Sequence, residues 1–191
     1  SFDIKRGERV ALIGNNGTGK TTILKIINDI LPADSGEIKL GSKVTIGYYD
    51  QEHHVLDPDK TLFEELQDAY PDLNNTQIRN TLAAFLFTND DVFKYIRDLS
   101  GGERGRVSLA KLMLSNANFL ILDEPTNHLD MVSKEILENA LNSYTGTVLY
   151  VSHDRYFINT TATRIIELVG QTTVNYIGNY DYYIDKKDAL T

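Results

Sequence analysis

Short apolar runs alternate with longer amphipathic segments along most of the chain. Residues 10–13 (Val-Ala-Leu-Ile) form an unbroken apolar run, which is typical of a strand buried on both faces of a parallel sheet. Comparable runs predict strands over 119–122, 147–151 and 164–169, and an edge strand over 173–177. Between them, apolar residues recur at helical spacing, which predicts helices over 21–31, 103–115, 132–143 and 154–161. This alternation indicates an α/β fold with a mostly parallel sheet flanked by helices.

Two parts of the chain depart from this alternation. Residues 1–5 alternate like a strand, and 37–40 with 44–49 predict a hairpin around Gly41-Ser42. We therefore expect a small antiparallel β part, truncated at the N-terminus, beside the parallel sheet. Residues 57–98 contain predicted helices over 61–69 and 76–87 and no strand pattern. The expected organisation is a single domain over 1–191, in which 1–56 and 99–191 form the α/β core and 57–98 is an inserted helical subdomain.

The composition limits the classes of function. The 191 residues, 41% hydrophobic and 24% charged, suit one soluble globular domain. The chain has 19 Lys+Arg against 27 Asp+Glu, giving a net charge of -8, whereas a domain that binds nucleic acid through its phosphates should be basic. Direct, sequence-specific nucleic-acid binding is therefore not expected. Contact with a nucleoprotein would need a local basic patch or a neighbouring domain.

Cysteine usage and hydropathy bear on the compartment. There is no cysteine, which excludes a disulfide framework, a zinc–thiolate site and a cysteine nucleophile, and fits a reducing cytoplasm. The apolar run 119–122, like every other aliphatic–aromatic run in the sequence, is far shorter than the roughly 18–20 residues of a membrane-spanning helix. No N-terminal charged-then-apolar segment resembles a signal peptide. We expect a cytoplasmic protein without a membrane span.

A glycine-rich segment between the first apolar strand and the first helix matches the P-loop pattern G-x-x-x-x-G-K-[ST] at every fixed position. It runs Gly14-Asn15-Asn16-Gly17-Thr18-Gly19-Lys20-Thr21 and is followed by Thr22. In such a loop the backbone N–H groups and the N-terminus of the helix bind phosphate oxygens. Lys20 is expected to reach the β- and γ-phosphates, and the Thr21 hydroxyl to bind Mg²⁺. The alternative is a glycine-rich turn without a ligand.

Two acidic residues end the apolar run at 119–122. Asp123 and Glu124 would lie beside the ligand crevice, which in open α/β sheets is at the carboxyl ends of the strands. Asp123 is expected to hold Mg²⁺, directly or through water, and Glu124 to orient and polarise the attacking water. A solvated acidic turn is the alternative, and the upstream P-loop makes it the weaker one.

The segment Leu99-Ser100-Gly101-Gly102-Glu103 opens a predicted helix. Ser100 suits the N-cap and Glu103 the third helical position, so a capping box is one interpretation. Two consecutive glycines weaken a helix, however, and fit a place where a phosphate approaches bare N–H groups. Gly105 should also cost up to roughly 1 kcal/mol of helix propensity if exposed, and no function for it follows from the sequence.

Together with Ser152-His153-Asp154, these motifs occur in the order found in ABC-type ATPase domains, and the chain resembles that family over nearly its whole length. The resemblance implies that Gln51 is the Q-loop residue, touching Mg²⁺ or the water. It also implies that His153 is the switch histidine at the γ-phosphate and that Asp130 is the D-loop aspartate. In this family, ATP is held between the P-loop of one domain and the LSGGE segment of another. Residues 99–103 would then serve a partner's nucleotide, and the adenine-stacking aromatic would lie upstream of residue 1.

Three further runs narrow the resemblance to the ABC-F class, in which one chain carries two ATPase domains and no membrane domain. They are 124–130 (EPTNHLD), 151–157 (VSHDRYF) and 178–183 (GNYDYY). Residues 47–52, with no long arm before LSGGE, resemble the second domain of such a chain. The class implies action on the ribosome, as a translation or antibiotic-resistance factor, through regions outside this segment.

Two other functions compete with an ABC-F ATPase. The ATPase subunit of a membrane transporter would share the same chemistry and would differ in its flanking sequence. An ATP-gated clamp that hardly turns over predicts a degenerate Glu124 or His153, and both are intact. A GTPase would carry an N-K-x-D run, which the sequence lacks.

Overall fold

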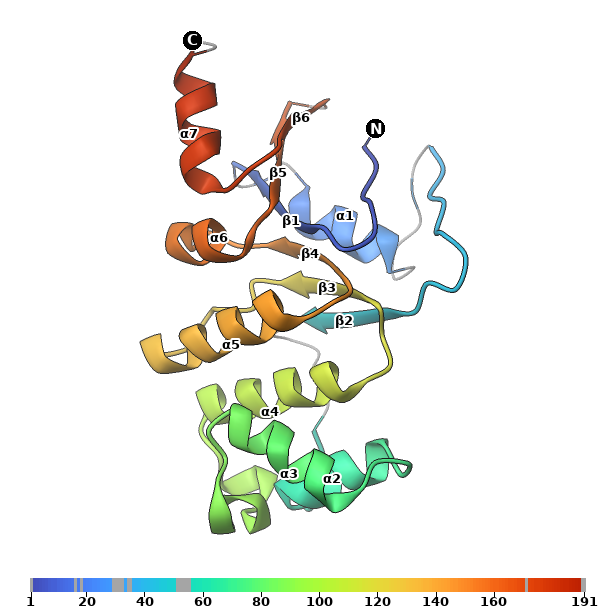
Figure 1. The fold of residues 1–191 in the computed structure, drawn as a ribbon, viewed down its shortest axis with the longest axis vertical. Helices are drawn as coiled ribbons and strands as arrows, with labels where there is room; N and C mark the ends of the chain where they lie inside the picture. Colours follow the sequence, from blue (N-terminus) through green and yellow to red (C-terminus); the bar gives the residue numbers. More distant parts are fainter. Residues whose placement is uncertain are drawn as a thin grey trace.

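A six-stranded sheet forms the centre of the computed structural model (Figure 1), which describes residues 2–15, 17, 19–28, 33, 36–50, 56–170 and 172–189. The strand order is β2-β3-β4-β1-β5-β6. The strands are β1 (Arg9–Gly14), β2 (Ile46–Asp50), β3 (Phe119–Asp123), β4 (Thr147–Val151), β5 (Arg164–Val169) and β6 (Thr172–Tyr176). All pairings are parallel except that of β5 with β6. The predicted α/β fold with a mostly parallel sheet is confirmed.

Helices cover both faces of this sheet. They are α1 (Lys20–Ile27), α2 (Leu62–Ala69), α3 (Asn75–Ala84), α4 (Gly101–Leu114), α5 (Met131–Ser143), α6 (Arg155–Thr161) and α7 (Tyr180–Ala189), with short 3₁₀ turns η1 (Asn89–Phe93) and η2 (Ile96–Asp98). Side chains alternate across β1, so Val10 and Leu12 pack with Leu24 of α1 on one face. Ala11 lies on the other face, in a second cluster with residues of α4, α5 and α6. All five residues of β4 are buried, as expected for a central parallel strand.

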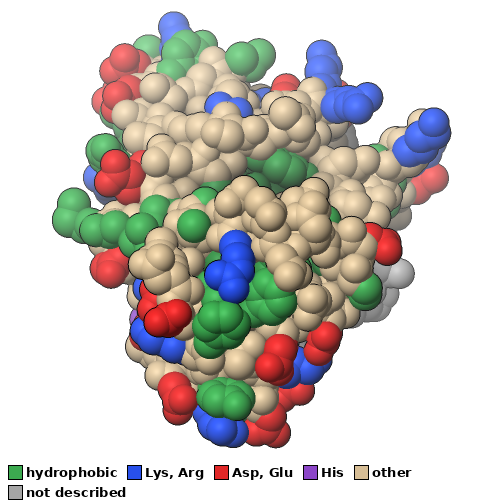
Figure 2. All heavy atoms as spheres, turned by 60° about the horizontal axis from the view of Figure 1, so that its bottom comes forward, with side chains coloured by type: hydrophobic (Ala, Val, Ile, Leu, Met, Phe, Trp, Pro, Cys, Tyr) green, Lys and Arg blue, Asp and Glu red, His purple; other side chains and the backbone are tan. Residues whose placement is uncertain are grey.

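Residues 57–98, hereafter the helical segment, contain α2, α3 and both 3₁₀ turns, and their only β pairing is an isolated Thr61–Tyr95 bridge. The helical segment lies at the end of the molecule opposite α7 and β6 (Figure 1). Seen from that end, acidic and basic side chains are interspersed around a hydrophobic patch (Figure 2). Within the segment, the guanidinium of Arg79 stands 5.3 Å from the ring centre of Phe93 and 5.8 Å from that of Phe63.

The end of α3 differs from the prediction, which extended this helix to residue 87. Phe87 N–H donates to the Leu82 carbonyl at 2.8 Å and Leu86 N–H to the Ala83 carbonyl at 3.0 Å. This is a Schellman ending, in which the residue after the cap adopts a left-handed conformation. Leu86 takes that conformation, with φ 69°, although glycine is the usual residue there. Apolar residues continue to Phe87, beyond the last helical residue, Ala84, and the prediction based on their spacing was therefore too long.

The hairpin predicted over 37–49 is wrong. Residues 36–44 form no strand, and β2 pairs in parallel with β3 instead. Ile38 and Leu40, whose alternation suggested a strand, are 45% and 50% exposed. Residues 2–5, also predicted as a strand, form none. The antiparallel part of the described sheet is β6 against β5.

The tyrosine-rich end of the chain forms α7, a helix that the sequence pattern did not predict. Tyr183 is buried and meets Tyr176 of β6 edge to face, with ring centres 4.8 Å apart. At the start of α7, the Asn159 amide donates to Asp181 Oδ2, and Asn159 Oδ1 accepts the Asp181 N–H, both at 3.1 Å. These contacts fix α7 against α6 and the edge of the sheet.

Candidate functional site

The glycine-rich loop joins β1 to α1 at the carboxyl end of the sheet. Gly17 and Gly19 have φ of 82° and 89°, a left-handed backbone that glycine adopts without the penalty of a side chain. Asn15 precedes them, and Asn16 and Thr18 lie outside the described residues. The loop therefore turns tightly into the N-terminus of α1, where an anion would meet free N–H groups.

Lys20, the first residue of α1, is 8% exposed. Its ammonium donates to the carbonyl of Gly14, at the end of β1. Burial lowers the pKa of Lys20 below its ordinary value, and the charge of Glu124 partly counteracts that shift. A buried cation is thus held at the mouth of the loop, with a backbone carbonyl as its hydrogen-bond partner.

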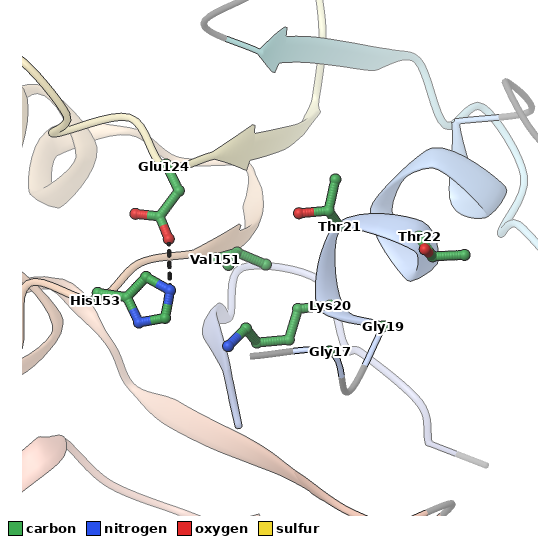
Figure 3. A pocket seen from close by; sticks show the side chains of 8 residues that line it. All are labelled: Gly17, Gly19, Lys20, Thr21, Thr22, Glu124, Val151 and His153. Atoms are coloured by element: carbon green, nitrogen blue, oxygen red, sulfur yellow. Dashed lines mark ion pairs between the residues drawn. The ribbon is translucent and has the colours of Figure 1, made fainter. Parts of the chain in front are cut away.

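A cavity of about 260 Å³ brings the predicted nucleotide-binding and catalytic residues together (Figure 3). It is lined by Gly17, Gly19, Lys20, Thr21, Thr22, Glu124, Val151 and His153. Figure 3 shows Lys20 and Thr21 on one side and Glu124 with His153 on the other. Val151 was not expected here; it enters because it is the last residue of β4, the strand beside β3.

Side-chain oxygen atoms of the kind that bind Mg²⁺ lie close together at the carboxyl ends of β2 and β3. The Thr21 hydroxyl donates to Asp123 Oδ1 at 3.5 Å, and Asp50 lies directly opposite Asp123 in the strand register. No group of three or more His, Cys, Asp or Glu side chains within the described ranges could hold a metal. Mg²⁺ usually takes one or two protein oxygens and completes its shell with water and phosphate, so these residues fit it. Gln51, predicted as a further ligand, lies outside the described residues.

Glu124 and His153 form a contact pair, with Oε1 3.2 Å from Nε2. Glu124 has φ 50°, rare for a residue with a side chain, and its N–H donates to the Val151 carbonyl at 2.9 Å. Burial raises the pKa of Glu124, as does the neighbouring charge of Asp123, while His153 and Lys20 act in the opposite direction. The result is a shielded carboxylate with a raised pKa, aimed into the cavity beside an imidazole that is 61% exposed.

Residues 99–103 lie outside this cavity, at the start of α4. Ser100 Oγ accepts the Glu103 N–H at 3.2 Å, and Glu103 Oε1 accepts the Ser100 N–H at 3.1 Å, so the capping box is present. A Cβ at Gly102 would stand 3.3 Å from the His128 carbonyl oxygen, whereas one at Gly101 would meet nothing within 4 Å. Gly102 thus allows α4 to approach the 124–130 loop closely, a role the sequence did not reveal. Leu99 is buried.

Gly105 is buried in α4. A Cβ there would make ordinary contacts of 3.7 Å with the Tyr49 hydroxyl and 3.8 Å with Leu129. The helix-propensity cost predicted from the sequence for Gly105 assumed an exposed position, so it does not apply to this buried glycine.

Asp130 is the N-cap of α5 and also lies outside the cavity. Its Oδ1 accepts the Ser133 N–H at 2.7 Å. The hydrogen bonds from the Ser133 side chain and backbone lower the pKa of Asp130. Asp130 is exposed and is followed by Met131 and Val132, which are 85% and 54% exposed. The loop thus presents a charged cap and two apolar side chains to the outside.

The site can be compared with known proteins. The sequence matches the ABC transporter family over residues 1–127. YdiF of Bacillus subtilis (strain 168) is 57% identical over 187 residues, covering 98% of this chain and 29% of YdiF. ABC transporter F family member 5 of Arabidopsis thaliana is 43% identical over 194 residues, covering 100% of this chain and 28% of that protein. The chain thus spans less than a third of the length of these relatives.

Among solved structures, a chain described as RNase-L Inhibitor superposes with a TM-score of 0.78 at 26% identity. The match covers 98% of this chain and 38% of that one. No helix among the described residues is both long and apolar enough to cross a membrane.

Proposed function

Because the chain belongs to the family of ABC transporter ATPase domains, we propose that it binds ATP in the cavity at Lys20 and hydrolyses it when a second ABC domain closes the site. One observation carries this proposal: a buried lysine, a threonine–aspartate pair and a glutamate–histidine pair, from three separate segments, line or adjoin one cavity. The match to the family supports the same conclusion independently.

Lys20 and the loop before it act on the triphosphate. The Lys20 ammonium leaves the Gly14 carbonyl and pairs with the β- and γ-phosphates, because phosphate oxygens carry more negative charge than a carbonyl. The N–H groups at the start of α1 donate to the same phosphates. Thr21 and Asp123 would hold Mg²⁺, with Gln51 as the expected third contact. When bound, the ion neutralises charge that develops on the transferring phosphoryl group.

Glu124 and His153 act at the γ-phosphate. Glu124 accepts a hydrogen bond from the attacking water and polarises it, and its raised pKa brings its basicity closer to neutrality, where a general base works best. His153 is exposed toward the cavity and can donate to a γ-phosphate oxygen while it orients Glu124. Together they would place the water in line with the bond that breaks.

Residues 99–103 explain the need for a partner. They lie outside the cavity at Lys20, so this chain does not supply both halves of a closed site. In the proposed dimer, Ser100 and the N–H groups of Gly101 and Gly102 face the γ-phosphate bound by the partner. The positive end of α4 then lies where negative charge develops during transfer.

For the cellular role, we propose an ABC-F protein that couples ATP-driven closure to action on the ribosome, through regions outside this segment. The runs at 124–130, 151–157 and 178–183 and the match to an ABC transporter F family member support it. The lack of cysteine fits a cytoplasmic location. We also propose that residues 57–98 act as the inserted helical subdomain, since they are helical and pack against α4. The second candidate, a transporter ATPase subunit, is supported by the family match alone.

The test uses a protein that carries this domain together with a second ABC domain, hereafter the two-domain protein. Glu124→Gln keeps the shape of the side chain and removes its charge, so ATP binding should survive while turnover falls by at least about tenfold. Unchanged turnover would show that Glu124 is not the base. Ribosome co-sedimentation with ATP should increase in this variant, because the closed state persists. If the variant instead accumulates with a membrane permease and not with ribosomes, the transporter alternative is correct.

A further inference from the structure

Lys134 occupies an unusual position for a cation. It lies in the first turns of α5, where the helix dipole disfavours positive charge. Its Nζ is 3.0 Å from Asp154 Oδ2, and the two side chains are 35% and 20% exposed. Neither residue lines the cavity. The ion pair joins the start of α5 to the turn that carries His153, and it explains why a lysine is tolerated here.

Asp154 uses its other polar groups to fix the backbone on both sides of His153. Its Oδ1 caps α6 by accepting the Phe157 N–H at 3.0 Å, and its own N–H donates to Ser152 Oγ at 3.0 Å. Burial alone would raise the pKa of Asp154, but the bonds from Phe157 and Lys134 outweigh it and lower the pKa. His153 is therefore held between two anchored residues.

At its other end, Lys134 is tied to the loop of Asp130. The Lys134 N–H donates to the Asp130 carbonyl at 3.0 Å, in the turn that the Asp130 side chain caps. A continuous set of contacts thus runs from Asp130 through Lys134 and Asp154 to His153, and from His153 to Glu124 at 3.2 Å. Each of the non-covalent contacts in this set is 3.2 Å or shorter.

We propose that Lys134 is a positioning residue for ATP hydrolysis: its ion pair with Asp154 holds His153 against Glu124 and links that pair to the exposed loop at Asp130. This inference rests on the proposed function, because that function places His153 and Glu124 at the γ-phosphate and pairs this chain with a second ABC domain, to which the exposed loop at Asp130 is accessible. Contact of the partner with that loop would shift the start of α5, and the Lys134–Asp154 pair would transmit the shift to His153.

Lys134→Met in the two-domain protein is the test. It keeps most of the length of the side chain and removes its charge. We expect kcat to fall roughly 3- to 30-fold while KM for ATP stays within about twofold, because nucleotide contacts are untouched. Lys134→Arg should restore most of the rate. The matched control is Lys60→Met, which breaks the 3.1 Å ion pair with Asp68 in the helical segment and should leave kcat unchanged.

A second readout does not depend on turnover. In protein labelled with ¹⁵N-histidine, the His153 ring resonances of the nucleotide-free state should move in Lys134→Met and not in Lys60→Met. Should Lys134→Met fail to fold, Asp154→Asn replaces it, because its amide oxygen can still cap α6 while the charge is lost. The double variant should be no slower than the slower single variant, since both remove the same contact.

Failure of the proposed function and failure of the positioning role of Lys134 would give different results. If Glu124→Gln leaves turnover unchanged, Glu124 is not the base, and the assignment of the Glu124–His153 pair to the reaction is wrong. If Glu124→Gln abolishes turnover while Lys134→Met alters neither kcat nor the His153 resonances, the positioning role is wrong and the ion pair only joins α5 to α6. If Lys134→Met lowers thermal stability but changes neither kcat nor the His153 resonances, the ion pair likewise only joins α5 to α6.

Discussion

Lys20 and Glu124 lie on facing sides of one cavity, and each charge offsets part of the cost of burying the other. Burial lowers the pKa of Lys20 while Glu124 raises it, and burial raises the pKa of Glu124 while His153 and Lys20 lower it. Burial therefore disfavours the charged form of both residues, and the opposite charge across the cavity offsets part of that cost. Substituting either one should change binding, turnover or stability in a distinct way.

Lys20→Ala should weaken ATP binding by at least about tenfold, because a hydrogen bond to a charged group typically contributes about 1.5–3 kcal/mol. Equilibrium binding of a fluorescent ATP analogue to the two-domain protein, with the other nucleotide site disabled, measures the effect. Lys39→Ala serves as the control, since Lys39 is exposed and pairs only with Glu37 among the ion pairs described. Affinity within about threefold of the parent would contradict the P-loop assignment.

Glu124→Gln should stabilise the fold at neutral and alkaline pH. Because the folded-state pKa of Glu124 is raised, the ionised carboxylate costs stability above that pKa, and below the ordinary carboxyl range the cost vanishes. The gain in Tm should therefore shrink as the pH falls from neutral through the raised pKa of Glu124 toward the ordinary carboxyl range. Thermal unfolding of parent and variant across this range tests the sign. A gain that grows toward acid pH would mean that the pKa is lowered instead.

Ser100→Arg should suppress hydrolysis at the partner's nucleotide site and leave ATP binding at Lys20 intact. The long cation would occupy the place where Ser100 approaches the partner's γ-phosphate. Single-site turnover, with one glutamate equivalent to Glu124 inactivated at a time, separates the two sites. Ser100→Ala controls for the lost N-cap, worth about 1 kcal/mol of stability. Loss of turnover only at this domain's own site would indicate a self-contained ATPase.

Gly47→Ala should destabilise the domain by about 1–3 kcal/mol through overpacking. A Cβ there would stand 2.7 Å from Leu112 Cδ1 and 3.0 Å from Ala117 Cβ. The leucine end can rotate, but the alanine Cβ moves only with its backbone. Urea unfolding measures the loss of stability, provided that the dependence of the unfolding free energy on urea concentration is the same in parent and variant. Gly41→Ala is the control, since its nearest neighbour would be Val44 at 3.6 Å, and equal stabilities in the two variants would show that the core yields freely.

Much of the sheet and the convergence at the cavity were predictable from the sequence. Strands buried on both faces are contiguous apolar runs, and the carboxyl ends of parallel strands share one edge of a sheet. Asp123, at the end of one such run, was therefore expected beside the loop that follows another. That His153 belongs to the same site was implied by family resemblance and not by spacing, and its contact with Glu124 was not predicted.

The errors share a physical cause, which is that a local pattern does not specify its partner. Residues 37–40 have the alternation of a strand, but β2 finds its hydrogen bonds on β3, far along the chain. Helix α7 has little apolar periodicity, and it is held by Tyr183 against Tyr176 and by Asn159 at its start. Nor does any pattern signal the pairing of Lys134 with Asp154, because it depends on how α5 and α6 pack.

One cluster of buried side chains runs without interruption from Leu62 and Ile78 in the helical segment, through Val107 of α4, to Tyr150 in the centre of the sheet. The helical segment therefore has no separate hydrophobic core that would let it unfold independently of the sheet. Its unfolding would expose one side of α4 and remove support from β2, so it should share a single cooperative transition with the sheet. Amides of α3 and β4 should then exchange with solvent through the same global opening.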